Sequence, residues 1–483
     1  MPENEIANSH GDTKVQRLSV KISASPRHRE KIKMKDSGIP WVGEIPEDWE
    51  IKKIKALGIL QGGNGFPEEL QGNLEAEIPF VKVKSLAEDP ILKIGKDTIS
   101  EEVRLNLKAT IIPRNSIVFA KVGAALLLQR FRKLEFSTCI DNNMMAFIPS
   151  EEIIPNFFVY ASSLFDFSLF VNPGTVPSVN QEQVGNVFIP FPDINIQKEI
   201  VDFLDTKTAE IDALIALQEK MIAELKSYKQ SVITEAVTRG VPADIKNSRE
   251  AAEAQSVPVK ISASPRPCEK IKTKDSGIPW LGSIPAHWEV RPLKTCATIN
   301  DDVLSENTPE DFVIKYIDIG SVSLTNGISR FEEMIFSESP SRARRKVKNG
   351  DVIISTVRTY LRAIAEVKNP EENWICSTGF AVVRAGEKLH SGFMKYALTS
   401  EYFVGDVIRY SSGLNYPTIN TPELGSIKIF VPPQNEQRTI SKYLDQKCAE
   451  IDSLISLKQQ KITTFQNYKK SVIFEYVTGK KGV

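Results

Sequence analysis

A short stretch at residues 48–52 carries the residue types of a metal-dependent nuclease. Asp48, Glu50 and Lys52 alternate in the pattern D-W-E-I-K, and two carboxylates with a lysine can hold Mg²⁺ and a hydrolytic water. A second copy of the stretch, at residues 287–291, reads H-W-E-V-R. Because the copy lacks both the aspartate and the lysine, we interpret the pattern as part of a structural frame and not as a catalytic centre.

The sequence lacks the motifs that other catalytic mechanisms would need. None of its four histidines is paired at metal-ligand spacing, and its five cysteines lie far apart without a C-x-x-C pair. It contains no phosphate-binding G-x-x-x-x-G-K-[ST] loop, no methyltransferase cofactor loop and no Asn-Pro-Pro-aromatic motif. We therefore expect a protein that binds without catalysing, with no cofactor or metal of its own.

Three groups of basic residues are candidates for contact with DNA. The chain has 61 Lys+Arg and 61 Asp+Glu, so positive charge has to gather locally if DNA is bound. Arginine suits this task because its guanidinium donates two parallel hydrogen bonds to guanine or phosphate. The alternative for each residue is a solvated surface charge. The candidate DNA-binding residues are Lys121, Arg130, Arg132 and Lys133 in the first group, Arg344 and Arg345 in the second, and Arg358, Thr359, Tyr360 and Arg362 in the third.

The sequence contains an internal repeat, and the repeat determines where the candidate residues lie in the fold. The blocks Val20–Trp41 and Val259–Trp280 differ at three positions, and the blocks Phe203–Ile215 and Tyr443–Ile455 match again at an offset of 240 residues. The two middles are nearly equal in length but share little identity. We interpret the repeated edges as a common frame and the middles as two readers of different targets. The alternative is an old duplication whose middles have drifted.

Each middle alternates short β-rich runs with turn signals, which is typical of a loop-rich α+β domain. The strand candidates are Ile78–Val83, Ser116–Ala120 and Met144–Ile148 in the first half, and Val313–Ile319, Asp351–Ser355 and Phe380–Arg384 in the second. Four tryptophans recur with the frame, and we expect them to anchor irregular loops by burial rather than to stack on bases. They are Trp41, Trp49, Trp280 and Trp288.

The repeated segments near residues 198–238 and 438–477 have no Gly or Pro, and their apolar residues recur at three- and four-residue steps. This pattern predicts two long amphipathic helices of coiled-coil character, each ending near a glycine, Gly240 or Gly479. About 40 residues at 1.5 Å per residue give a rod of roughly 60 Å. Each helix needs a partner for its stripe, and antiparallel pairing with its twin would create a pseudo-twofold axis. The predicted packing residues are Ile211, Ile215, Ile222, Leu225, Ile451, Ile455, Ile462 and Phe465.

A chain of 483 residues is too long for one core, so at least two domains are expected. The predicted boundaries are a mobile tail at 1–34, a first variable domain at 35–192, a helical spacer at 193–240, a linker at 241–273, a second variable domain at 274–432 and a second spacer at 433–479. The N-terminus has no apolar core of a signal peptide, and no apolar run is long enough to cross a bilayer. These features favour the cytoplasm.

Two variable domains, each followed by a closely similar long helix, resemble the specificity subunits of type I restriction-modification enzymes. The resemblance runs through nearly the whole chain from Lys35. Short sequence motifs also resemble the family. They are the opening Asp36–Pro46 with its copy from Asp275, and the exit phrase Val431–Ile440, which leads into Tyr443-Leu-Asp445. The segment Phe119–Gly123, and the segment Ser355–Arg362 with Ser377–Phe380, look like two subtypes of target recognition domain. The first half departs from the exit phrase, because Ile196-Gln197 stands where the second half has Glu436-Gln437.

The resemblance implies a non-catalytic DNA-binding subunit of a restriction system. Each domain would read one half-site of a bipartite double-stranded target, and half-sites on one face of DNA lie about 34 Å apart per turn. The paired helices would set the spacing and dock two methyltransferase subunits, and motor-nuclease subunits would complete the enzyme. S-adenosylmethionine, ATP and Mg²⁺ would bind those partners and not this chain. Two alternatives remain: a self-contained Mg²⁺-dependent endonuclease, and a coiled-coil adaptor that binds no DNA.

Overall fold

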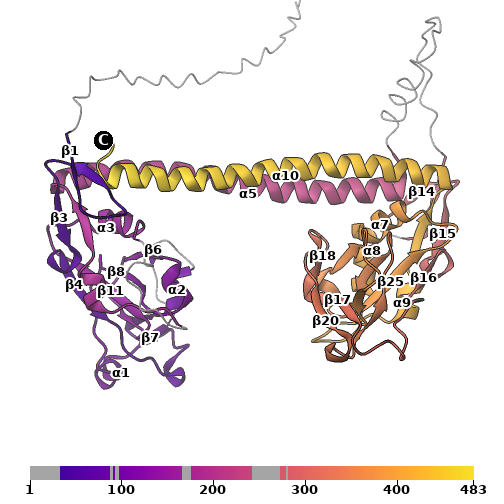
Figure 1. Ribbon diagram of the computed structural model, residues 1–483, viewed down its shortest axis with the longest axis horizontal. Coiled ribbons are helices and arrows are strands. Elements are labelled where there is room, and N and C mark those ends of the chain that lie inside the picture. Colours follow the sequence, from indigo (N-terminus) through magenta and orange to yellow (C-terminus); the bar gives the residue numbers. More distant parts are fainter. Residues whose placement is uncertain (1–32, 88–90, 93–96, 166–175, 242–271, 279–280) are drawn as a thin grey trace, which may run out of the picture. The chain divides into compact units, whose positions relative to one another are not determined.

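The computed structural model describes residues 33–87, 91–92, 97–165, 176–241, 272–278 and 281–483. The chain forms two compact units (Figure 1): unit 1 consists of Met1–Asp212 with Gln466–Val483, and unit 2 consists of Ala213–Phe465. Unit 1 therefore takes its last segment from the C-terminal end of the chain. The predicted tail and linker lie outside the described residues, apart from their last or first few positions.

Unit 1 is built on two small β-sheets with helices at their edges (Figure 1). The larger sheet has the order β4-β11-β8-β9-β6, and the smaller has the order β10-β5-β7. The strands are β4 (Gly58–Gly62), β5 (Ile78–Val81), β6 (Ile91–Leu92), β7 (Asp97–Ile99), β8 (Ile117–Ala120), β9 (Arg132–Leu134), β10 (Cys139–Ile140) and β11 (Met144–Pro149). Hairpin β1 (Met34–Asp36)–β2 (Glu44–Pro46) and the pair β3 (Glu50–Lys53)–β12 (Phe188–Phe191) frame the domain, with α1 (Glu101–Asn106), α2 (Ala124–Leu127), α3 (Pro155–Ser162) and α4 (Gln181–Gly185).

Unit 2 repeats this plan. One sheet has the order β16-β25-β22-β23 and the other has the order β20-β17-β24-β21. The strands are β16 (Ala297–Ile299), β17 (Val313–Ile317), β20 (Glu332–Ile335), β21 (Ala343–Lys346), β22 (Val352–Ser355), β23 (Ile364–Glu366), β24 (Trp374–Ser377) and β25 (Phe380–Ala385). The pairs β13 (Thr273–Asp275)–β14 (Ser283–Pro285), β15 (Glu289–Pro292)–β26 (Lys428–Val431) and β18 (Val322–Ser323)–β19 (Gly327–Ile328) flank them, with α7 (Ser391–Thr399), α8 (Glu401–Arg409) and α9 (Thr421–Ser426). Each of the six segments predicted as strands contains one, which confirms the α+β class.

The two long helices are α5 (Ile194–Arg239) and α10 (Gln434–Val477), and they run antiparallel in both units. In unit 2, Val237 near the end of α5 belongs to the same core as Leu444 near the start of α10. In unit 1 the order is reversed, because Leu204 near the start of α5 shares a core with Val477 at the end of α10. This confirms the predicted pairing of the twin helices.

Equivalent ion pairs in the two units show the antiparallel register of the long helices. Lys229 Nζ lies 2.7 Å from Asp452 Oδ2 in unit 2, and Lys469 Nζ lies 2.7 Å from Asp212 Oδ2 in unit 1. The two pairs are related by the 240-residue offset of the repeat, with donor and acceptor exchanged between the helices. The helix pair in unit 1 therefore makes the same contact as the helix pair in unit 2, with the two helices exchanged.

The buried contact face between the long helices contains fewer residues than the sequence pattern predicted. Of the eight predicted packing residues, Ile211, Ile222, Ile451 and Ile462 are buried, whereas Ile215, Leu225, Ile455 and Phe465 are only partly covered. Other apolar residues of the same stripe are exposed, in three twin pairs: Leu214 and Leu454, Leu217 and Leu457, Tyr228 and Tyr468. A two-helix pair covers only the narrow face of each helix that meets the partner, so the rest of a broad stripe stays in water.

Each long helix ends on a tryptophan of the repeated frame. Gly240, at φ 86°, and Gly479, at φ 69°, adopt the left-handed conformation that stops a helix. A Cβ added to Gly240 would lie 3.6 Å from the ring of Trp288, and one added to Gly479 would lie 3.1 Å from the ring of Trp49. Both tryptophans are buried, which confirms their expected anchoring role. Trp41 is partly buried against the Phe165 ring, and Trp280 lies outside the described residues.

A buried glutamine fixes the start of each long helix. In α10, Gln437 Oε1 accepts a hydrogen bond from His390 N at 2.7 Å, and its Nε2 donates to Lys388 O and Pro432 O, both at 2.9 Å. Its twin Gln197 makes the same three kinds of bond in unit 1, with Ile154 N, Glu152 O and Pro192 O. Both side chains are completely buried. Both halves therefore have this buried glutamine at the start of the long helix, although the residue before it is Ile196 in the first half and Glu436 in the second.

We predict that Gln437→Leu destabilises the protein by about 2–4 kcal/mol, because one buried amide and two buried carbonyls lose their partners. Urea unfolding of the full chain measures this change. Gln434→Leu is the matched control, since Gln434 Nε2 donates a single exposed hydrogen bond, to Glu387 O. Equal effects of the two substitutions would show that the buried bonds do not hold the helix start.

Candidate nucleic-acid interface

The first group of candidate residues begins at a tight turn after β8, which we call turn 1 (Gly123–Gln129). The turn is fastened to the segment before α4, because Val179 N donates to Lys121 O at 2.9 Å and Gly123 N donates to Pro177 O at 2.8 Å. Gly123 has φ 76°, a value that favours glycine. Gln129, at φ 51°, ends the turn, and its Nε2 donates to Phe165 O at 2.8 Å.

Turn 1 presents apolar side chains to solvent. Leu126 is buried and anchors the turn, while the next two residues, Leu127 and Leu128, are more than half exposed. Lys121 is partly buried, and a Cβ on Gly62 of β4 would lie 3.6 Å from its Nζ. The predicted residues Arg130, Arg132 and Lys133 directly follow the turn and are partly buried. The structure thus brings the first group together around one strand end.

The third group forms the corresponding turn of unit 2, turn 2 (Arg358–Arg362), which follows β22. Ile419 N donates to Thr356 O at 3.0 Å, and Arg358 N donates to Pro417 O at 2.8 Å. Arg358 and Arg362 have φ 51° and 53°, in the left-handed region that costs a non-glycine residue roughly 1–2 kcal/mol. Strain of this kind persists where the surrounding structure enforces it and is common at binding sites.

Side chains of turn 2 divide into anchors and exposed groups. Thr359 is buried and its Oγ1 lies 2.7 Å from Ser411 Oγ, so it holds the turn. Arg362 Nη1 pairs with Glu401 Oε1 at 2.5 Å. Tyr360 and Leu361 are more than half exposed. Of the predicted residues in this group, Arg358 and Tyr360 are therefore the ones that the fold leaves most available to a ligand.

Sequence reasoning missed an aromatic loop beside turn 2. The Arg358 guanidinium lies 4.7 Å from the centre of the Tyr416 ring, and the Arg409 guanidinium lies 5.1 Å from the Tyr410 ring. Both tyrosines are exposed, and Leu414 between them is fully exposed. The available signal was the run S-S-G-L-N-Y-P at residues 411–417. Its Gly, Asn and Pro indicate a turn, where an apolar or aromatic residue has no core to enter.

The second group lies in the other sheet of unit 2, on β21. The Arg344 guanidinium stacks 4.7 Å from the Phe336 ring, and its Nη1 donates to Ala343 O at 3.2 Å. Arg345 is partly buried, and its Nε and Nη1 are buried without a hydrogen-bond partner. Burial lowers the pKa of Arg345 and raises the pKa of the neighbouring Cys376 thiol to about 12. Arg345 is thus a donor-rich side chain that the free protein does not satisfy.

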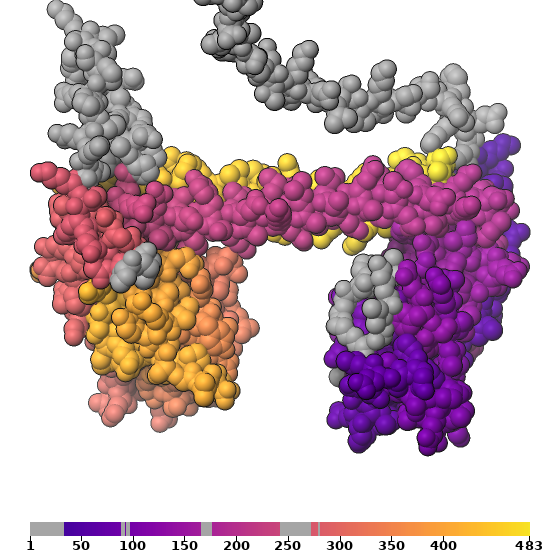
Figure 2. All heavy atoms as spheres, turned by 180° about the vertical axis from the view of Figure 1, so that it is seen from behind, coloured from indigo at the N-terminus to yellow at the C-terminus, as the bar shows by residue number. Residues whose placement is uncertain are grey.

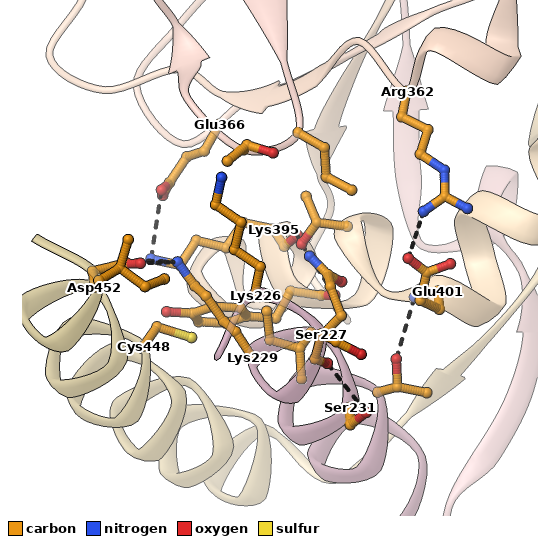
Figure 3. A pocket seen from close by; sticks show the side chains of 18 of the residues that line it. Lys226, Ser227, Lys229, Ser231, Arg362, Glu366, Lys395, Glu401, Cys448 and Asp452 are labelled. Atoms are coloured by element: carbon orange, nitrogen blue, oxygen red, sulfur yellow. Dashed lines mark hydrogen bonds and ion pairs between the residues drawn. The ribbon is translucent and has the colours of Figure 1, made fainter. Parts of the chain in front are cut away.

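A cleft of about 1630 Å³ lies in unit 2 between its domain and its parts of the long helices (Figure 3). Charged side chains of both signs line it. Lys395 Nζ lies 2.8 Å from Asp445 Oδ1 and 3.5 Å from Glu366 Oε2, and Arg362 and Glu401 form the ion pair at one side (Figure 3). Pockets for small cofactors are mostly apolar with a few polar groups, so this polar cleft does not resemble one.

The nuclease-like pattern of the sequence is a surface ion pair. Lys52 Nζ lies 3.0 Å from Glu152 Oε2 and 3.6 Å from Glu50 Oε2, and the hydrogen bond to Glu152 raises the pKa of Lys52. The same ammonium lies 4.0 Å from the Phe191 ring. Within the described residues, no group of three or more His, Cys, Asp or Glu side chains is arranged to hold a metal ion.

Comparison with known proteins points to one family. The sequence family described as "Type I restriction modification DNA specificity domain" matches residues 46–227 and 285–464, which together make up more than half of the chain. The MjaVIII specificity subunit of Methanocaldococcus jannaschii is 24% identical over 455 residues, covering 90% of this chain and 93% of that protein. The StySPI specificity subunit of Salmonella potsdam is 19% identical over 462 residues, covering 90% of each.

A solved structure from a study of complex assembly and conformational transition in a type I restriction-modification system has the same fold. It superposes with a TM-score of 0.59 at 15% identity and covers 90% of this chain and 99% of that chain. In the described part of the chain, no helix combines the length and apolar character that a membrane span requires.

We predict that Arg345→Met stabilises the free protein by about 1–3 kcal/mol, because an apolar side chain of similar length replaces a partly buried guanidinium whose Nε and Nη1 are buried without partners. Urea unfolding measures the change. Arg344→Met is the control: it removes a hydrogen bond and a ring contact from the adjacent residue, and it should not stabilise. A loss of stability in Arg345→Met would mean that the guanidinium already has compensating partners.

Proposed function

We propose that this chain, which belongs to the family of type I restriction-modification DNA specificity subunits, reads a bipartite DNA target with one half-site for each unit. Membership makes it the DNA specificity subunit of such a system, which is non-catalytic. One observation carries the proposal: the two units share a repeated frame, yet their strand-end turns differ in length and in most of their residues. A split target with two different half-sites requires two different recognition surfaces on one scaffold.

The DNA contacts divide by chemistry. Lysines and arginines bind phosphates and supply affinity, whereas side chains that reach base edges supply specificity. We assign the phosphate role to Lys121, Arg130, Arg132, Lys133, Arg344, Arg345 and Arg362, which flank the turns or lie partly buried. We assign base contact to the exposed residues of turn 2, Arg358 and Tyr360, while Thr359 supports them from below.

In this proposal the long helices bind the methyltransferase subunits. We propose target recognition domains at 35–192 and 274–432, joined by the helical spacers at 193–240 and 433–479, with the tail 1–34 and the linker 241–273 outside them. Figure 2 shows one face of α5 open to solvent. The exposed twin residues Leu214 and Leu454, Leu217 and Leu457, and Tyr228 and Tyr468 form two equivalent sets. Exposed apolar groups in a regular array mark protein interfaces, and two equal sets suit two equal methyltransferase subunits.

The remaining partners supply the chemistry. Methyltransferase subunits would bring S-adenosylmethionine, and motor-nuclease subunits would bring ATP and Mg²⁺, so this chain needs no cofactor of its own. The helices would set the distance between half-sites by their length, because an α-helix advances about 1.5 Å per residue without bending sharply unless it contains a proline or a similar break. The assembled enzyme would act on chromosomal DNA in the cytoplasm.

We expect deletion of the gene for this chain to remove one split methylated motif from the host genome and to leave all other methylation unchanged. Methylome sequencing of the deletion strain beside its parent measures this. Restoring the gene on a plasmid should restore the same motif. If the parent carries split methylated motifs and all of them survive the deletion, the chain does not select the target of a methyltransferase.

We predict that Leu457→Glu lowers the number of bound methyltransferase subunits from two to one, and that Leu217→Glu with Leu457→Glu lowers it to none. Each leucine is more than half exposed, so a charge is tolerated in the free protein but not in an apolar interface. Native mass spectrometry of the purified complex counts the subunits. Lys461→Glu, an exposed charge change on the same helix, is the control and should keep both. Two subunits on the double variant would contradict this docking surface.

A further inference from the structure

Turn 1 and turn 2 occupy the same place in the fold, although no residue pattern relates them. Each follows a buried strand, β8 or β22, at the centre of its sheet. The first residue of each donates its backbone N–H to a proline carbonyl, Gly123 to Pro177 and Arg358 to Pro417, both at 2.8 Å. Isolated bridges Val122–Ser178 and Val357–Thr418 fix the preceding residues in the same way. The start of each turn is thus fastened by the same two kinds of backbone contact, although ψ is −169° at Gly123 and 50° at Arg358.

The match continues to the end of the turns. A buried residue anchors each, Leu126 in turn 1 and Thr359 in turn 2, and two residues more than half exposed follow it. A left-handed residue then closes each turn, with a side chain tied to the segment after a matching helix. Gln129 Nε2 donates to Phe165 O after α3, and Arg362 Nη1 pairs with Glu401 after α7. The exposed pair is therefore held on a rigid base in both units.

The exposed side chains of the two turns differ: turn 1 offers two leucines, whereas turn 2 offers Arg358 and Tyr360 beside Leu361. Leu127 and Leu128 have no hydrogen-bonding side-chain atoms, so they can distinguish bases only by apolar contact. In the major groove the apolar group is the C5-methyl of thymine. Lys121 lies at the base of turn 1, where its charge complements phosphate. Double-stranded DNA offers both groups to one surface, which is why we take it as the occupant.

Turn 2 carries an arginine where turn 1 carries a glycine. Arg358 keeps the positive φ that Gly123 adopts without strain, so its side chain is retained against a conformational cost. The guanidinium carbon lies 4.7 Å from the centre of the Tyr416 ring, a cation–π contact that uses none of its N–H groups as hydrogen-bond donors. A planar two-donor edge matches O6 and N7 of guanine.

We propose that turn 1 and turn 2 are equivalent specificity elements that read different bases. In unit 1, Leu127 and Leu128 contact a thymine methyl group in one half-site. In unit 2, Arg358, backed by Tyr416, contacts guanine in the other. This inference rests on the proposed function and adds to it the residues and the base type for each half-site.

The test measures affinity of the complex of this chain with its methyltransferase subunits for duplexes that carry the methylated motif. Replacing the contacted thymine by uracil removes only the methyl group, and we expect about a four-fold loss of affinity. Replacing the contacted guanine by 7-deazaguanine removes the N7 acceptor, and we expect a loss of at least about five-fold in the other half-site. Each base of the motif is replaced in turn.

Two variants connect each base to its turn. Leu127→Ala with Leu128→Ala should bind the thymine and uracil duplexes equally, and should keep the 7-deazaguanine effect. Arg358→Gly should lose the 7-deazaguanine effect and keep the uracil effect. Glycine at this position relieves the positive φ, as Gly123 does in unit 1, so unfolding cannot explain its loss of discrimination. Leu105→Ala on α1, at another exposed leucine, is the control and should change neither effect.

The outcomes separate this inference from the proposed function. If the complex binds the motif no better than unrelated DNA, both fail. If it binds the motif specifically but its variants keep both base effects, or if neither half-site contains thymine, the turns are not the readers and the proposed function stands. If both variants lose the same base effect, the turns do not read separate half-sites.

Discussion

The structure depends on an apolar stripe that one helix cannot bury by itself. Helices α5 and α10 have 46 and 44 residues, and the apolar residues near their ends are buried in two cores that each combine both helices with one domain. In unit 1 the core is completed by Val472, Ile473 and Val477 from the far end of the chain, and in unit 2 by Val232, Ile233 and Val237 from the first half. Neither half of the chain therefore closes its hydrophobic core alone, although each half contains its own copy of the domain and of the long helix.

A polar frame holds each domain on its helix. Besides the buried glutamines, Tyr160 Oη donates to Asp205 at 2.6 Å in unit 1, and Tyr396 Oη donates to Asp445 at 2.8 Å in unit 2. Burial and the carboxylate raise the pKa of both phenols, so each stays a donor. Asn180 and Asn420 close matching capping boxes at α4 and α9. Because these bonds recur between equivalent residues of the two halves, the frame can stay constant while the residues it presents change.

The turns show how much sequence change such a frame tolerates. Backbone hydrogen bonds to Pro177 and Pro417 fasten the first residue of each turn and do not depend on the side chains at the tips of the turns. Leucines at the tip of turn 1 and an arginine with a tyrosine at turn 2 are therefore compatible with one fold. Recognition residues on loops held by a rigid scaffold are a general arrangement in binding proteins. Here the scaffold is repeated and the reading residues are not.

The sequence by itself determined the repeat, the α+β class, the long helices with their glycine ends and the family, because periodicity, Gly placement and matching blocks are local signals. Tertiary structure decided which members of a pattern are available. Leu214 and Tyr228 belong to the apolar stripe but are exposed, Thr359 is buried at a turn predicted to face DNA, and Tyr416 was not singled out. These outcomes depend on bonds and packing between segments far apart in the chain, such as that between Arg358 N and Pro417 O. No local pattern in the sequence encodes which distant segment will meet a given turn.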